Sequence, residues 1–298
     1  MRATDNVHVL QAGERAFAGA YSPNVYAVID SGTAVLIDAA LPDDASIRDR
    51  LEYLRSIGEP CVALIIITHH HFDHAGGAHR LSEATGARIA MHPEEERLLR
   101  EASRRPHSDA TPQAEQVRQE AAKTAVDRRL AEGDVIRVGR LTLRIVDTPG
   151  HSPGHICVFL EEGRVLFSGD NVLGLGTTAI PPPPDGDMTR YVESLEKMKS
   201  LDASLICPGH GPLVHEPRRK IRELIDHRRE REEQVLALLR EGKRTPAEIV
   251  RAIYPELDPR LERMAQGQVM SHLYKLRDEG KATFRRQGHA FVCGLPDS

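Results

Sequence analysis

Four side chains that can bind a metal ion fall within six consecutive positions of the chain. Residues 69–74 read His-His-His-Phe-Asp-His and follow an apolar run that ends at Ile67, which predicts a buried strand leading directly into them. Because successive side chains of a strand point to opposite faces, His69 and His71 share one face and His70 points away from it. Two imidazoles on one side of a strand end form the start of a transition-metal site.

Three later segments place a histidine or an aspartate beside a glycine at the end of an apolar run. They are Gly150-His151, Gly169-Asp170 and Gly209-His210. Since strand ends that meet at one rim of a fold bring their side chains together, we expect these segments to complete a site for two neighbouring ions. The candidate metal ligands are His69, His71, Asp73, His74, His151, Asp170 and His210.

The chemistry of such a set is metal-assisted hydrolysis. An imidazole-rich site favours zinc, although iron or manganese can occupy the same ligands. Two cations about 3.5–4 Å apart lower the pKa of a bridging water, so that hydroxide exists near neutral pH, and they stabilise the oxyanion that it creates. Asp73, bound through one oxygen, is our candidate for the group that protonates the leaving group.

Four nearby polar residues are assigned lesser roles. Ser152 and Ser168 stand next to candidate ligands but lack the G-x-S-x-G turn of a serine nucleophile. We interpret both as loop hydrogen-bonding groups. For His155 and His215 the sequence leaves open whether either orients a ligand through its ring nitrogen.

The elements that must position these residues alternate between strands and helices. Residues 26–29, 34–38 and 63–68 read as strands, with helices among them, as over about 43–57. A second strand-rich block follows between residues 135 and 168. Two β-rich halves with helices outside predict a layered α/β sandwich.

Two further segments have a distinct character. Residues 94–132 form a charged, alanine-rich stretch that we expect to be helical and largely solvent-facing. Four consecutive prolines at 181–184 predict a stiff loop that ends any helix.

The tail predicts a module of its own. Residues 217–240 read as a long charged connector helix, and two helical runs followed by a hairpin-like stretch at 281–293 indicate a small winged-helix-like domain. We therefore divide the chain into a catalytic domain, residues 1–216, and a connector helix with a winged-helix-like domain, residues 217–298.

The composition is that of an ordinary globular protein of 298 residues, with 40% hydrophobic residues and a net charge of −4. The four cysteines, Cys61, Cys157, Cys207 and Cys293, are far apart and form no C-x-x-C pair, which favours a reducing compartment. No apolar run is long enough to span a bilayer, and residues 1–13 lack the pattern of a signal peptide. We expect a cytoplasmic protein with no membrane partner.

The order and spacing of the candidate ligands resemble those of the metallo-β-lactamase superfamily, whose H-x-H-x-D-H motif is matched by residues 69–74. The resemblance implies an αββα sandwich with a binuclear zinc site. The family pattern implies that His69, His71 and His151 bind the first ion, that Asp73, His74 and His210 bind the second, and that Asp170 bridges both.

Further segments are similar to the beta-lactamase-like protein 2 subgroup of that superfamily. They are residues 169–178, residues 208–212, and the arginine-rich helix that contains His227. Members of the subgroup carry a winged-helix-like tail, and they include a single-strand-specific endoribonuclease and enzymes that cleave polyketide thioesters. The prolines at 181–184 depart from the subgroup's pattern and bear on the shape of the pocket.

Three functions compete at this point. The favoured one is hydrolysis of small esters or thioesters, because aromatic residues are not interleaved with basic ones near the motif, as stacking on bases requires. The alternative is cleavage of single-stranded RNA, with phosphates contacted by Arg277, Lys281, Arg285 and Arg286 of the mildly basic tail. A minor alternative is a non-enzymatic, metal-sensing regulator that binds DNA through the tail. Dimerisation through the tail is left open.

Overall fold

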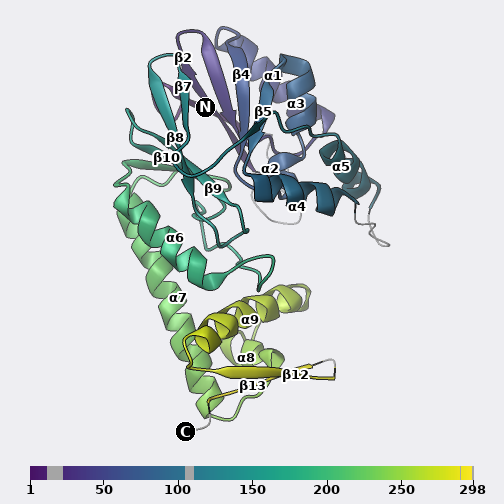
Figure 1. Ribbon diagram of the computed structural model, residues 1–298, viewed down its shortest axis with the longest axis vertical. Coiled ribbons are helices and arrows are strands. Elements are labelled where there is room, and N and C mark those ends of the chain that lie inside the picture. Colours follow the sequence, from purple (N-terminus) through teal and green to yellow (C-terminus); the bar gives the residue numbers. More distant parts are fainter. Residues whose placement is uncertain (12–22, 105–110, 289, 297–298) are drawn as a thin grey trace. The chain divides into compact units, whose positions relative to one another are not determined.

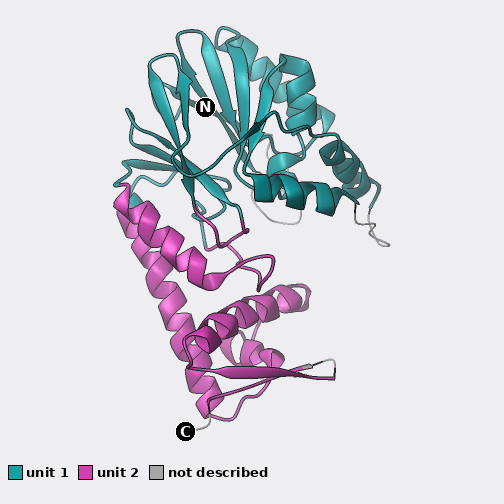
Figure 2. Cartoon of the chain, in the orientation of Figure 1, with its two compact units in different colours: residues 1–147, 154–176, 202–217 teal, residues 148–153, 177–201, 218–298 magenta. Residues whose placement is uncertain are grey.

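The structure is a computed structural model that describes residues 1–11, 23–104, 111–288 and 290–296 (Figure 1). The chain divides into two compact units (Figure 2). The first consists of residues 1–147, 154–176 and 202–217, and the second of residues 148–153, 177–201 and 218–298. The second unit therefore combines the tail with two stretches that precede it in the sequence, and the division at 216–217 stays a prediction about domains.

One sheet of the first unit has, within the described ranges, six strands in the order β1-β2-β3-β4-β5-β6. Their bounds are β1 Val7–Gln11, β2 Asn24–Asp30, β3 Thr33–Ile37, β4 Cys61–Ile67, β5 Arg88–Met91 and β6 Arg128–Arg129. Strands β1 to β3 pair antiparallel, and β3 to β6 pair parallel. Because β3 and β4 are parallel neighbours, the residues that follow them emerge at the same edge of the sheet.

The other sheet of the first unit has, in the same described part of the chain, five strands in the order β11-β10-β9-β8-β7. Their bounds are β7 Val135–Val138, β8 Leu141–Asp147, β9 Ile156–Leu160, β10 Val165–Gly169 and β11 Leu205–Pro208. Strands β10 and β11 are parallel, and the other pairs are antiparallel. Asp170 and Gly209, which follow β10 and β11, thus emerge side by side.

The core lies on both faces of β4. Leu64 and Ile66 belong to a buried cluster that includes Ile145 of β8, so the two sheets pack face to face. Ile65 and Ile67 point to the opposite face and belong to a second buried cluster. The all-apolar sequence of β4 follows from this burial on both sides.

Helices cover the outer face of the six-stranded sheet (Figure 1). They are α1 Asp44–Ser56, α2 Phe72–Ala75, α3 Ala78–Thr85, α4 Pro93–Arg104 and α5 Pro112–Ala122. The predicted layered α/β sandwich is confirmed. Within 94–132 the prediction of helix holds for α4 and α5 and is wrong for 123–132, which contains strand β6, whereas residues 105–110 lie outside the described residues. Most of α4 is not buried, as predicted, and its buried residues are Glu95, Leu99 and Ser103.

The second unit contains the tail. Its elements are α6 Met188–Ser200, α7 Pro217–Arg240, α8 Pro246–Ile253, the 3₁₀ helix η2 Pro259–Leu261, α9 Glu262–Asp278, and the antiparallel strands β12 Thr283–Gln287 and β13 Ala290–Gly294. A capping box between Thr245 and Glu248 begins α8. Val235, Ile249 and Leu273 form part of a separate core. Helices followed by a hairpin match the predicted winged-helix arrangement.

Two expectations about the chain's environment concern membranes and thiols. No helix in the described ranges combines the length and the apolar character that crossing a bilayer needs. All four cysteines lie in those ranges and form no disulfide there, with Cys61 exposed and the other three buried.

Candidate metal centre

The segment 69–74 takes its shape from the end of β4. His69 follows the strand as a fully buried residue, and the chain then turns into the short helix α2, which carries Asp73 and His74. The N–H of Gly77 donates to the carbonyl of Ala40 at 2.7 Å, and a Cβ at this glycine would collide with the backbone of the loop after β3. Glycine therefore allows the loops that follow β3 and β4 to touch.

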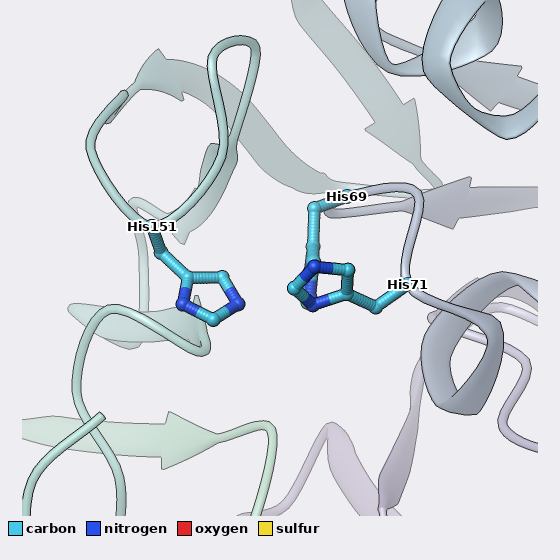
Figure 3. Close-up of side chains that lie close together, drawn as sticks. All are labelled: His69, His71 and His151. Carbon is cyan, nitrogen blue, oxygen red and sulfur yellow. The ribbon is translucent and has the colours of Figure 1, made fainter. Parts of the chain in front are cut away.

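The structure brings all seven predicted ligands into three overlapping groups. Within each group the ligand atoms lie within 4.8 Å of one another. The groups are His69, His71 and His151; His69, His74 and Asp170; and Asp73, His74 and His210. Figure 3 shows the first group, in which the imidazoles of His69 and His71 face that of His151. The middle group shares one histidine with each of the others.

Distances between neighbouring ligand atoms fit shared metal ions. Nε2 of His69 lies 3.0 Å from Nδ1 of His71, and Nε2 of His74 lies 3.1 Å from Nε2 of His210. Oδ1 of Asp170 lies 3.2 Å from Nε2 of His74 and 3.5 Å from Nε2 of His210. Two atoms bound to one tetrahedral zinc ion, each at about 2.0–2.1 Å, are about 3.3 Å apart. The donor atoms thus stand at the spacing of metal ligands.

Two glycines keep the space beside these ligands open. A Cβ on Gly209 would lie 2.5 Å from Oδ1 of Asp170 and 2.7 Å from Cε1 of His74. Gly169 has a φ of +47°, and a Cβ there would lie 2.5 Å from Nε2 of His155. Ligands from neighbouring strand ends can therefore approach the backbone closely.

The carboxylates of the cluster favour positive charge at its centre. Burial alone would lower the pKa of His74, but the carboxylates of Asp170 and Asp38 raise it well above its usual value. Burial would likewise raise the pKa of Asp73, yet His74 and a hydrogen bond from His210 hold it at about 2. A divalent cation supplies the positive charge that such a field favours.

Sequence reasoning missed Asp38, a buried residue directly after β3. Its Oδ2 lies 2.8 Å from Nδ1 of His74 and accepts the hydroxyl of Thr68 at 3.0 Å, and its Oδ1 accepts the N–H of Thr68 at 2.8 Å. This carboxylate orients a candidate ligand through the ring nitrogen that faces away from the cluster. The sequence offers one indication of this residue, because Asp38 ends an apolar run as Asp170 does.

Sequence reasoning also missed Glu95 on α4, which is fully buried. Its Oε2 accepts the backbone N–H of His70 at 2.7 Å and Nδ1 of the same residue at 2.6 Å. Its Oε1 accepts the N–H of Gly154 at 2.7 Å. The Glu95 carboxylate therefore connects the segment 69–74 to the chain just before β9. It also binds the side chain of His70, the histidine that was predicted to point away from the ligand face.

The four residues with lesser assigned roles differ in their placement. His155 is fully buried, and its Nε2 accepts the N–H of Asp170 at 3.2 Å, so it is placed to orient that ligand. His215 is exposed. The hydroxyl of Ser168 donates to the carbonyl of Val172 at 2.8 Å, as a loop role requires, and Ser152 is buried.

Comparison with known proteins agrees with this geometry. Residues 18–210 match the Metallo-beta-lactamase superfamily, and residues 245–288 match the Beta-lactamase associated winged helix domain. The first match covers more than half of the chain, so the protein belongs to the metallo-β-lactamase superfamily.

Individual relatives extend the comparison. A Drosophila melanogaster protein named Beta-lactamase-like protein 2 homolog is 30% identical over 261 residues, which cover 87% of this chain and 83% of that protein. Atrochrysone carboxyl ACP thioesterase of Aspergillus fumigatus is 31% identical over 242 residues, covering 76% of this chain and 67% of that protein. A solved metallo-β-lactamase family protein of Thermus thermophilus has a TM-score of 0.78 at 25% identity, with 98% of this chain and 99% of that chain covered.

These matches confirm the family resemblance, the metallo-β-lactamase fold and the winged-helix tail. The chain is a hydrolase of the metallo-β-lactamase superfamily, a family that typically binds metal ions and often zinc, and its His and Asp cluster is suited to that role.

Proposed function

We propose that the protein is a binuclear zinc-dependent hydrolase of small esters or thioesters. The overlap of the three ligand groups carries the proposal. The group that contains Asp170 shares His69 with one of the other two groups and His74 with the other. Asp170 therefore lies between the two groups of histidines, where a carboxylate could bind both ions. One ion is then held by His69, His71 and His151, and the other by Asp73, His74 and His210.

Two zinc ions bound there would supply hydroxide near neutral pH and stabilise the developing oxyanion. The chain's own residues orient the ligands and handle protons. The side chain of Asp73 is 43% exposed, against 12% for Asp170 and 14% for His210, so it is the ligand carboxylate that substrate reaches most easily. We assign to Asp73 the relay of a proton, taken from the hydroxyl group that has added to the carbonyl carbon of the substrate, to the leaving group.

The substrate class is supported by the relatives. The Aspergillus fumigatus relative is named a thioesterase acting on an acyl carrier protein substrate. A thiolate leaves readily because the thiol pKa is about 8.5, whereas an alkoxide needs a proton to leave. In variant protein that keeps its full metal content, Asp73→Asn should therefore slow oxygen-ester hydrolysis more than thioester hydrolysis, and equal losses for both would contradict the role of Asp73 in protonation.

The tail gives little reason to prefer RNA as the substrate. Arg277 lies over the rings of Tyr274 and Phe284, at 4.8 and 5.1 Å from their centroids. Lys281 pairs with Glu279 at 2.7 Å. These two cations stabilise the tail itself, and the zinc-dependent esterase or thioesterase remains the function that we propose.

A direct assay tests the proposal. Zinc-loaded protein is offered acyl thioesters, oxygen esters, lactones, a phosphodiester reporter and short single-stranded RNA. We expect turnover of thioesters or esters that His69→Ala abolishes and that His79→Ala retains, because His79 pairs with Glu83 on α3 and lies outside the three ligand groups. Fully metallated protein that is inert toward all esters and thioesters would refute the proposal.

A further inference from the structure

The ring of His151 is oriented by the segment after β10. Its Nδ1 lies 3.0 Å from the carbonyl oxygen of Ala179 and 3.1 Å from Oγ1 of Thr178. A carbonyl oxygen can only accept, so Nδ1 carries the proton and Nε2 carries the lone pair that binds a metal ion. The position of the Ala179 carbonyl therefore decides both the tautomer of His151 and the direction of its ligand nitrogen.

Helix α9 of the winged-helix tail holds this segment in place. Pro181 and the three prolines after it have no N–H to donate, so the last backbone donor before them is that of Ile180. This N–H donates to Oε1 of Gln268 on α9 at 2.9 Å. The hydroxyl of Ser271, one turn further along α9, donates to the carbonyl of Pro181 at 3.3 Å.

Helix α7 anchors the other end of the segment. Nη2 of Arg228, a residue that is 2% exposed, donates to the carbonyl of Thr178 at 2.7 Å. The same guanidinium lies over the ring of Tyr191 on α6, at 5.2 Å from its centroid. Tyr191 in turn packs against Gly150, where a Cβ would collide with it. The backbone before His151 and the segment that contacts its ring are thus both held within the second unit.

We infer that the winged-helix tail orients the candidate ligand His151 within the second unit, with Gln268 as a positioning residue that acts on His151 through Ile180 and Ala179. This role rests on the proposed function, because it takes His151 as a metal ligand. The face of α9 that carries Gln268 and Ser271 is occupied by residues 180–181, so it is not a free nucleic-acid-binding face. The tail contributes to hydrolysis by fixing the tautomer and direction of one ligand.

Metal affinity of three full-length variants tests this role. Gln268→Met keeps the length of the side chain but removes the acceptor for Ile180, and its zinc dissociation constant should rise about tenfold with an altered visible spectrum of the cobalt-substituted protein. Gln268→Glu keeps an oxygen acceptor and should stay within about twofold of the wild type. Gln266→Met is the matched control, because Gln266 on the same helix donates to Glu262 instead of binding the loop.

A second readout needs no metal. In chelator-treated protein labelled with ¹⁵N-histidine, the nitrogen shifts of His151, assigned by their loss in His151→Gln, report which ring nitrogen carries the proton. Gln268→Met should shift the ring toward the other tautomer, whereas Gln266→Met should not. Wild-type zinc affinity together with wild-type His151 shifts in Gln268→Met would overturn the role of Gln268.

The two readouts separate this role from the proposed function. If the wild-type chain binds no zinc, the proposed function fails, and the His151 shifts still decide whether Gln268 controls the tautomer. If Gln268→Met does not fold, Ser271→Ala replaces it, since it removes the other α9 contact to the same segment. Unchanged affinity and unchanged shifts in Ser271→Ala would then count against the role of the tail.

Discussion

Asp38 and His74 form a buried carboxylate–imidazole pair in which Oδ2 lies 2.8 Å from Nδ1 and the side chains are 3% and 0% exposed. Thr68 donates to both oxygens of the carboxylate, so its direction is fixed by the ends of β3 and β4. Because the carboxylate accepts from Nδ1, Nε2 of His74 faces Asp170 and His210, at 3.2 and 3.1 Å. The pair prepares His74 to be a ligand.

Asp38→Asn is expected to weaken zinc binding by about 10- to 100-fold, because an amide in place of the carboxylate no longer fixes the tautomer of His74. Competition with a chromophoric chelator measures the change. Asp30→Asn is the matched control: Asp30 is also a buried carboxylate, but it binds Arg140 instead of a histidine, and its loss should leave zinc affinity unchanged. Wild-type affinity in Asp38→Asn would show that the pair has no such role.

Glu95→Gln tests the contact between α4 and the segment 69–74. Glu95 accepts three N–H groups, and a glutamine places an amide donor against at least one of them. Leaving a buried donor unpaired costs about 1–3 kcal/mol of unfolding free energy, so the variant should unfold at a lower denaturant concentration than the wild type. Its zinc affinity should also be lower. Glu96→Gln changes the next residue of α4, which pairs with Arg100 and Arg129 at the surface, and should cost less than about 1 kcal/mol. Equal stabilities of the two variants would contradict the buried role of Glu95.

The candidate ligands could be predicted from the sequence because each stands at the end of an apolar run, which is a local pattern. Asp38 also ends an apolar run, but it lacks the neighbouring glycine that marks His151, Asp170 and His210. Glu95 is different. It stands between Glu94 and Glu96 in the first turn of a charged helix, and nothing local separates it from its neighbours. Its burial depends on how α4 packs in the fold.

The role of the tail could not be predicted for a similar reason. Ile180 and Gln268 are 88 residues apart. Nothing in the sequence around a glutamine on an amphipathic helix indicates which distant backbone N–H its side chain will accept. The four prolines after Ile180 lie in a loop, as predicted. Because prolines have no N–H, the N–H of Ile180 is the last backbone donor before them. The sequence alone does not show that Gln268 accepts it.

Gly209→Ala and Gly267→Ala are expected to have opposite effects. A methyl group at Gly209 would press on Asp170 and His74, which should cost about 1–3 kcal/mol of unfolding free energy and reduce zinc affinity. Gly267 lies inside α9, and the nearest atom to a Cβ there, Cδ of Pro182, is 3.9 Å away. Alanine should therefore stabilise the chain by about 0.5–1 kcal/mol. Chemical denaturation measures both, and a stabilised Gly209→Ala would contradict the tight packing at the ligands.

The pair of Asp30 and Arg140 predicts a dependence of stability on pH. Hydrogen bonds from Arg140 hold the pKa of Asp30 well below its usual range. A depressed carboxyl pKa stabilises the folded chain above the unfolded-state pKa of about 3.9, and this contribution is lost as the pH falls further. In chelator-treated protein, Asp30→Asn should therefore be less stable than the wild type at pH 7, with a gap that narrows below about pH 4. Arg140→Gln should show the same trend, and a gap that is constant with pH would contradict it.

Zinc should raise the thermal stability of the chain. Ligands from His69 to His210 meet only in the folded state, so the unfolded chain cannot reproduce the site, and binding is coupled to folding. At free zinc of about 100 times the dissociation constant, one ion adds about 2.7 kcal/mol. Calorimetry of chelator-treated and zinc-loaded protein measures the shift in Tm. His69→Ala should lose most of that shift, because His69 belongs to two of the three ligand groups, whereas His79→Ala should keep it. A wild-type Tm that is the same with and without zinc would mean that the converging imidazoles hold no ion.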